Sequence, residues 1–125
     1  MFSKIILDKS NLINNIDVIE AVSGRKICAM VKANAYGHGA KEIVQMLQGR
    51  IDYFGVSNQT EAEELREVSS AHIIVFGACE DYASCIKKEI SFALLSYSHA
   101  KEIVKIYKRI HIKPRMHLCV NSGMN

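Results

Sequence analysis

Runs of apolar residues recur about every twenty residues along the chain, and the stretches between them have apolar residues spaced as on one face of a helix. The runs are short and continuous instead of alternating with polar residues, which is typical of parallel strands buried on both faces. We therefore predict five strands, within Lys26–Val31, Tyr53–Ser57, Ile73–Gly77, Phe92–Leu95 and Met116–Val120.

Five helices are predicted around these strands. Ser10 is positioned to cap the first helix, and Gly24 follows its end. Thr60 and Glu63 match a capping box, in which the hydroxyl and the carboxylate each accept a hydrogen bond from a free backbone amide. The predicted helices are Asn11–Val22, Ala40–Gln48, a helix that opens at Thr60, Asp81–Lys87 and Ser98–Arg109.

Strands that alternate with helices predict an α/β fold with a parallel sheet, and two such folds compete. A doubly wound sheet could close with five strands, whereas a (β/α)₈ barrel needs eight strands and typically about 250 residues. On strand count alone the doubly wound sheet is favoured, because it would be complete at 125 residues.

Composition narrows the class of protein. The chain is 49% hydrophobic and 23% charged, which excludes a disordered segment. No apolar stretch approaches the roughly 20 residues of a membrane helix, and the N-terminus lacks a cleavage-site pattern, so we expect a cytoplasmic protein. The net charge is +3, and the basic and acidic residues are interspersed along the chain, without the basic stripe of a nucleic-acid-binding protein. The four cysteines lack zinc-ligand spacing, so we expect reduced thiols and no metal site.

The most informative segment begins at the end of the first predicted strand, where Lys32 follows an apolar stem. Removal of water from a lysine favours its neutral amine, which can attack an aldehyde and form a Schiff base. Tyr36 then offers a hydroxyl donor, and Gly37 and Gly39 allow close approach of the backbone. A strand-end lysine before a glycine-rich loop is also common without such a role, and His38 alone is more typical of a loop or capping residue than of a catalytic base. The segment completes neither a dinucleotide fingerprint nor a P-loop.

The motif Val31-Lys32-Ala33-Asn34-Ala35-Tyr36-Gly37-His38-Gly39 resembles the pyridoxal-phosphate (PLP) attachment motif of bacterial alanine racemases. Val75-Phe76-Gly77-Ala78 is similar to the ending of that family's third strand, and His117–Asn125 resembles its fifth-strand motif. The resemblance therefore implies the N-terminal half of a PLP-binding (β/α)₈ TIM barrel with about five parallel strands.

The resemblance also implies roles for individual residues. Lys32 would hold PLP as a Schiff base and then act as the base on one face of the substrate α-carbon, while Tyr36 donates its hydroxyl to the cofactor phosphate and Phe76 lines the cofactor wall. The activity implied is the interconversion of L-alanine and D-alanine, which supplies D-alanine for peptidoglycan. In the family the opposite-face proton donor is a tyrosine of the partner subunit, so a homodimer is expected for the full-length protein.

Two features separate this chain from the family pattern. Cys119 stands where the family usually has a carbamylated lysine that orients an arginine, and a thiol cannot carry that group. The arginine, the opposing tyrosine and the remaining cofactor contacts would all follow Asn125. We therefore expect residues 1–125 to be a truncated portion of the barrel domain, without the rest of the barrel and the C-terminal β domain, and inactive alone. The alternatives are another PLP-dependent racemase or decarboxylase of this barrel class, or a non-catalytic five-stranded binding module.

Overall fold

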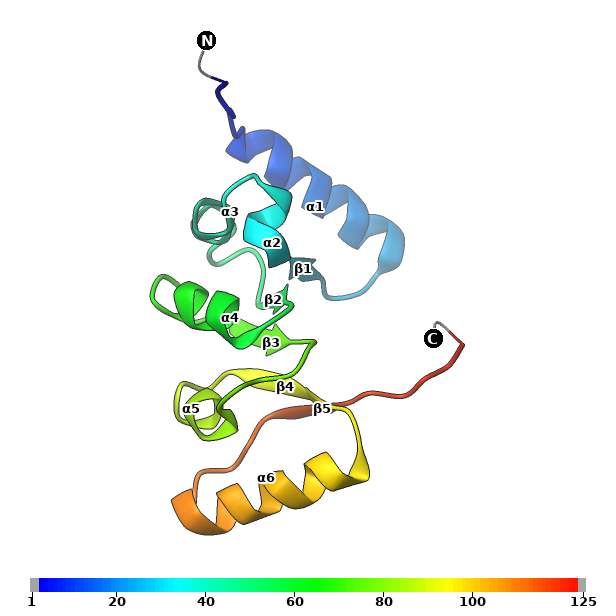
Figure 1. Ribbon diagram of the computed structural model, residues 1–125. Helices are drawn as coiled ribbons and strands as arrows, with labels where there is room; N and C mark the ends of the chain where they lie inside the picture. The colour runs from blue at the N-terminus through cyan, green and yellow to red at the C-terminus, as the bar shows by residue number, and fades with distance from the viewer. Residues whose placement is uncertain (1–2, 124–125) are drawn as a thin grey trace.

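In the described part of the chain, five parallel strands form one sheet in the order in which they occur along the sequence, β1-β2-β3-β4-β5 (Figure 1). The computed structural model describes residues 3–123. The strands overlap all five predicted runs and are β1 (Cys28–Met30), β2 (Tyr53–Val56), β3 (His72–Val75), β4 (Ser91–Leu94) and β5 (Met116–Leu118). Every neighbouring pair is parallel, with Met30 opposite Gly55 and Gly55 opposite Ile74. The predicted parallel α/β fold is confirmed.

The strand order decides between the two folds that strand counting left open. A doubly wound sheet reverses its strand order at a switch point and carries helices on both faces. Here the order never reverses, and α3, α4 and α5 lie along the same side of the sheet (Figure 1). The doubly wound module is therefore wrong, because a sequential parallel sheet with its helices on one side is the wall of a (β/α)₈ barrel.

Within residues 3–123, six helices connect or flank the strands: α1 (Lys9–Ser23), α2 (Lys32–Tyr36), α3 (Ala40–Met46), α4 (Gln59–Arg66), α5 (Tyr82–Lys87) and α6 (Tyr97–Ile110). Five of them match predicted helices, and α2 was not predicted. No helix in the described part of the chain is long and apolar enough to cross a membrane.

The helix ends differ from the predicted caps. Asp8, not Ser10, caps α1, and its carboxylate accepts from the backbone N of Asn11 at 3.1 Å. Gly24 does end α1 in the left-handed conformation, as predicted. The predicted capping box at Thr60 is wrong, because Asn58 caps α4 and accepts from the backbone N of Glu61 at 2.9 Å. Because this cap uses the backbone N–H of Glu61, the carboxylate of Glu61 can accept hydrogen bonds at the carboxyl edge of the sheet.

The hydrophobic core lies between the sheet and its helices. Alternate strand residues face the helices and are fully buried, among them Phe54, Val56, Ile73, Val75 and Phe92. The prediction that strands are buried on both faces holds for the central strands only, because β1 and β5 are largely exposed in this chain. Packing against the helices therefore fixes the sheet and leaves its carboxyl edge free to carry a site.

Candidate active site

Lys32 lies two residues after the end of β1 and begins α2, at the edge where the carboxyl ends of all five strands meet. Val31, the residue before it, is buried in the core and donates its backbone N–H to the carbonyl of Gly55 at 2.9 Å. The lysine side chain is half-buried. Reactive groups of parallel α/β folds occur at this edge, and the sequence-predicted Lys32 lies there.

The short helix α2 is left-handed. Ala33, Asn34 and Ala35 have φ of 51°, 53° and 52° with ψ near the same values, and Tyr36 continues the turn with φ of 54°. Each residue of such a turn costs about 1–2 kcal/mol because its Cβ approaches the following carbonyl oxygen. A run of four is therefore maintained by its surroundings, and strain of this kind concentrates at functional sites.

Several hydrogen bonds hold the left-handed turn. The backbone N of Ala33 donates to Glu61 Oε1 at 2.7 Å, and that of Ala35 donates to the Val31 carbonyl at 2.9 Å. At the other end, Asn34 Oδ1 accepts from the backbone N of Ala40 at 2.8 Å, which joins the turn to the start of α3. Ala35 is buried in the core cluster, so its methyl group anchors the middle of the turn.

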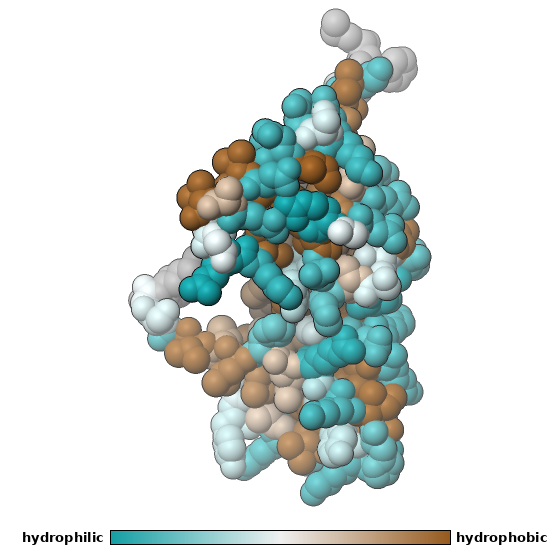
Figure 2. All heavy atoms as spheres, turned by 180° about the vertical axis from the view of Figure 1, so that it is seen from behind, coloured by the Kyte–Doolittle hydropathy of each residue, from teal (hydrophilic) through white to brown (hydrophobic). Residues whose placement is uncertain are grey.

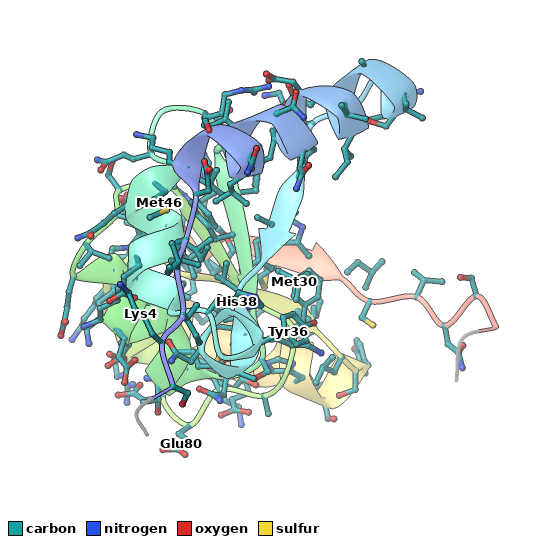
Figure 3. The ribbon with its side chains drawn as sticks, turned by 90° about the horizontal axis from the view of Figure 1, so that it is seen from above. Lys4, Met30, Tyr36, His38, Met46 and Glu80 are labelled. Carbon is teal, nitrogen blue, oxygen red and sulfur yellow. The ribbon has the colours of Figure 1, made fainter. Side chains whose placement is uncertain are left out.

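The turn leaves Tyr36 on the surface. Its side chain is 63% exposed, and in the view from above Tyr36 and Met30 project over the same part of the molecule (Figure 3). Within residues 3–123, no other residue forms a hydrogen bond or an ion pair with the amine of Lys32 or the hydroxyl of Tyr36. An amine and a phenol thus stand near each other along the chain with their polar atoms available to a ligand.

His38 lies in the loop between α2 and α3, as predicted. Its Nδ1 is 2.9 Å from the carbonyl oxygen of Ala35, so the imidazole closes the C-terminal end of the left-handed turn. This contact agrees with the interpretation of His38 as a loop or capping residue.

The sheet face beside this edge is apolar and closely packed over β2. A Cβ atom added to Gly55 would lie 2.3 Å from Met30 Sδ and 2.9 Å from Phe76 Cε2. The missing side chain at Gly55 therefore lets Met30 and Phe76 approach each other across β2. Phe76 remains half exposed just after the end of β3, and its role as a cofactor wall stays a prediction.

Gly77 keeps the ends of β2 and β3 close together. Its backbone N donates to the carbonyl of Ser57 at 3.1 Å, and a Cβ atom at this position would lie 2.3 Å from the same oxygen. Only glycine fits without moving backbone, so the Val75–Ala78 segment singled out in the sequence has a physical reason for its glycine.

Glu61 is the functional candidate that the sequence did not single out. Its Oε2 accepts from both the backbone N and the hydroxyl of Ser57 at 2.9 Å, while Oε1 accepts from Ala33. Burial opposes ionisation of the carboxyl, but these donors outweigh it and lower the pKa of Glu61. In the sequence, Asn58 and Glu61 have the spacing of a capping box, but the prediction of Thr60 as the cap placed that box two residues later.

The described residues include all four cysteines and most of the fifth-strand motif. All four cysteines are free thiols; Cys79 and Cys85 are buried, whereas Cys28 and Cys119 are exposed. Cys119 follows β5 and donates its backbone N–H to the carbonyl of Leu94 at 3.1 Å. The last two residues of the motif, Met124 and Asn125, lie outside the described residues. Within residues 3–123, no three His, Cys, Asp or Glu side chains are grouped so that they could hold a metal ion.

Known proteins resemble this chain in sequence and in fold. The family described as "Alanine racemase, N-terminal domain" matches residues 7–125. An alanine racemase of Francisella philomiragia is 36% identical over 122 residues, covering 95% of this chain and 33% of the relative. The structure of an alanine racemase from Clostridium difficile superposes with a TM-score of 0.85 at 33% identity, covering 93% of this chain and 32% of the other. The biosynthetic alanine racemase of Pseudomonas aeruginosa gives 0.84 at 29% identity, with coverages of 95% and 34%. The chain thus spans about a third of the length of these relatives.

Proposed function

Because the chain belongs to the family of alanine racemase N-terminal domains, we propose that residues 1–125 form the first part of the barrel domain of a PLP-dependent racemase. The reaction proposed is the interconversion of L-alanine and D-alanine in the cytoplasm, as a supply of D-alanine for peptidoglycan. The rest of the barrel and a C-terminal β domain would account for the greater length of the relatives.

The observation that carries this proposal is the pairing of Lys32 and Tyr36 by a strained left-handed turn at the carboxyl edge of the sheet. The chemistry of these groups suits PLP: a primary amine for its aldehyde, a phenolic hydroxyl for its phosphate, and the apolar surface of Met30 and Phe76 for its ring. Neither polar group is engaged by another described residue, so neither contact with the cofactor requires an internal bond to break.

In the proposed mechanism, PLP when bound supplies an electron sink that makes the α-hydrogen of an amino acid acidic. Lys32 would hold the cofactor through Nζ, and its amine, when free, would accept a proton from one face of the α-carbon in one direction of the reaction and donate a proton to that face in the reverse direction. Tyr36 donates its hydroxyl to the phosphate and so fixes the cofactor relative to Lys32.

Inversion also needs a proton donor on the opposite face of the α-carbon, which we propose comes from the partner subunit of a homodimer. At the end of β5, Cys119 occupies the position where the family pattern has a carbamylated lysine. We propose that this protein orients the corresponding arginine by another contact, because a thiol does not form that carbamate.

Equilibrium dialysis with PLP tests the proposed site. We expect the chain to retain about one PLP per molecule, Lys32→Ala to lose the tightly held fraction, and Tyr36→Phe to weaken binding about tenfold or more through loss of a charge-assisted hydrogen bond. Tyr107→Phe is the matched control, because Tyr107 lies near the C-terminal end of α6 and should leave binding unchanged. Retention of PLP by Lys32→Ala at the wild-type level would refute the assignment.

Activity tests the proposal that essential groups lie outside this chain. With L-alanine and PLP present, residues 1–125 should form little or no D-alanine, because the opposite-face proton donor is missing. Robust D-alanine formation by this chain would show that the site needs nothing more.

A further inference from the structure

We infer that Glu61 is a positioning residue whose carboxylate holds the left-handed turn of α2 in the conformation that presents Tyr36. Its effect on the turn is a property of this chain alone, and its consequence for PLP binding rests on the proposed function.

The carboxylate joins two loops at the carboxyl edge of the sheet. Oε1 accepts from the backbone N of Ala33 at 2.7 Å, at the start of the left-handed turn after β1. Oε2 accepts from the backbone N and the hydroxyl of Ser57, each at 2.9 Å, in the loop after β2. Both oxygens are therefore used, and the end of β1 is tied to the end of β2 through one side chain.

One of these contacts, that with Ala33, lies outside an ordinary helix cap. A carboxylate in the first turn of a helix usually serves the free amides of its own helix. The cap of α4 is Asn58, whereas Glu61 Oε1 reaches an amide 28 residues away in sequence. The side chain thus serves both the left-handed turn and the start of α4, where Ser57 and Asn58 also donate to it.

The hydrogen bond from the Ala33 amide to Glu61 fixes the start of a strained turn. The turn is left-handed from Ala33 to Tyr36, a conformation that L-residues avoid, and fixing its first amide limits how it can unwind. Asn34 Oδ1 fixes the other end by accepting from Ala40. Loss of the Glu61 contact would leave the Ala33 amide, at the start of the turn, without its acceptor, while the contacts of Ala35 and Asn34 remain.

Amide hydrogen exchange of the Glu61→Gln variant tests this inference without any cofactor. Glutamine keeps the size of the side chain but has one oxygen. Its NH₂ group, which cannot accept a hydrogen bond, would therefore face the N–H of Ala33 or of Ser57. We expect exchange at Ala35, Gly37 and His38 to be accelerated about tenfold or more, with exchange in β2 and β3 unchanged. Glu64→Gln is the matched control, because Glu64 is exposed on the same helix and makes none of these contacts.

Two results would overturn the inference. Unchanged exchange in the turn would mean that Glu61 does not hold it, and equal acceleration in β2 and β3 would mean a general effect on stability. If Glu61→Gln does not fold, Ser57→Ala decides. It removes the hydroxyl donor to Oε2, together with the 3.5 Å contact of that hydroxyl with Asn58 Nδ2, and keeps the carboxylate and both backbone amides. This variant should accelerate exchange about two- to fivefold at the same amides, and no acceleration would refute the inference.

PLP binding separates this inference from the proposed function. Glu61→Gln should raise the dissociation constant for PLP about tenfold while Lys32 still forms the covalent link at saturation, because the lysine itself is untouched. Unaltered PLP affinity in a variant whose turn exchanges faster would overturn the link between the turn and the cofactor. If the wild-type chain binds no PLP, the proposed function fails, and hydrogen exchange still decides the role of Glu61.

Discussion

At the carboxyl edge of the sheet, Lys32 and Tyr36 are the proposed contacts to the cofactor, and Glu61 supports the backbone that carries them. Lys32 and Tyr36 have polar atoms that no other described residue engages, whereas both oxygens of Glu61 are occupied. A ligand can therefore bind the first two without displacing internal contacts, and the third keeps the backbone between them in its strained form. Preorganisation of this kind lowers the entropy that binding must otherwise remove.

Glu63, two residues further along α4, makes a testable contribution to stability at the residue scale. Lys88 Nζ lies 2.7 Å from its carboxylate, and Gln59 and Ser84 donate to it at 2.8 and 3.1 Å. The ion pair with Lys88 above all lowers the pKa of Glu63 from 4.5 to about 2. Because the folded-state pKa is the lower one, this stabilisation is complete above pH 4.5 and is lost as the pH falls toward 2.

We therefore expect Glu63→Gln to lower the free energy of unfolding by about 0.5–1 kcal/mol at pH 7, and by less as the solution is acidified toward pH 3. Urea unfolding at several pH values measures the difference, with Glu64→Gln as a control for loss of charge on the same helix. A deficit of the same size at pH 3 and pH 7 would contradict the assigned ion pair.

At the scale of elements, α2 differs in kind from its neighbours. The other helices are right-handed, whereas α2 is a left-handed turn that connects β1 to α3 and buries only the methyl group of Ala35. Its sequence of small residues, with an asparagine and a following glycine, suits positive φ better than bulky or β-branched residues would. The element serves to place two side chains and contributes little core.

Glycine substitution tests this conformation, because replacing alanine by glycine should stabilise the protein at a left-handed residue and destabilise it at a right-handed helical one. Ala33 is exposed and has φ of 51°, so Ala33→Gly removes a steric cost and should raise the free energy of unfolding by about 0.5–1 kcal/mol. Ala21 is exposed within α1, where Ala21→Gly should lower it by about 1 kcal/mol. Urea denaturation of both variants gives the comparison. Destabilisation of similar size by both would contradict a left-handed α2.

The elements show where sequence reasoning works and where it stops. The strands and the five right-handed helices follow from local periodicity, which burial against one core imposes on each segment. The handedness of α2 does not, because it depends on an acceptor from Glu61, which is remote in sequence. Caps are also ambiguous locally: Asp8, Asn58 and Ser96 each begin a helix two residues before another plausible capping residue. Lys32 and Tyr36 could be predicted from their motif, but Glu61 required the fold.

At the scale of the whole molecule, residues 3–123 form a barrel wall of five strands in which β1 and β5 each pair with one other strand, so that each has one edge unpaired within these residues. Apolar side chains are exposed next to the C-terminal end of the chain (Figure 2), where Leu118 and Val120 are 74% and 71% exposed. Unpaired strand edges with exposed apolar side chains favour pairing with other chains.

We expect residues 1–125 to self-associate with rising concentration and Leu118→Lys to weaken this association about tenfold or more, because exposing a leucine that is buried on pairing costs about 1.5–3 kcal/mol. Ile6→Lys is the matched control, since Ile6 is 77% exposed and lies outside the sheet. Sedimentation velocity over a wide concentration range measures both variants. A wild-type chain that stays monomeric throughout would contradict the prediction.

The central claim is that Lys32 is the residue that holds PLP, and borohydride trapping tests it most directly. The folded chain is incubated with PLP and reduced with borohydride, which converts a Schiff base into a stable secondary amine, and the modified peptide is located by mass spectrometry. We predict one adduct, on Lys32, that is absent from Lys32→Ala. An adduct distributed over exposed lysines such as Lys101 and Lys105, or no adduct on a folded chain, would contradict the claim.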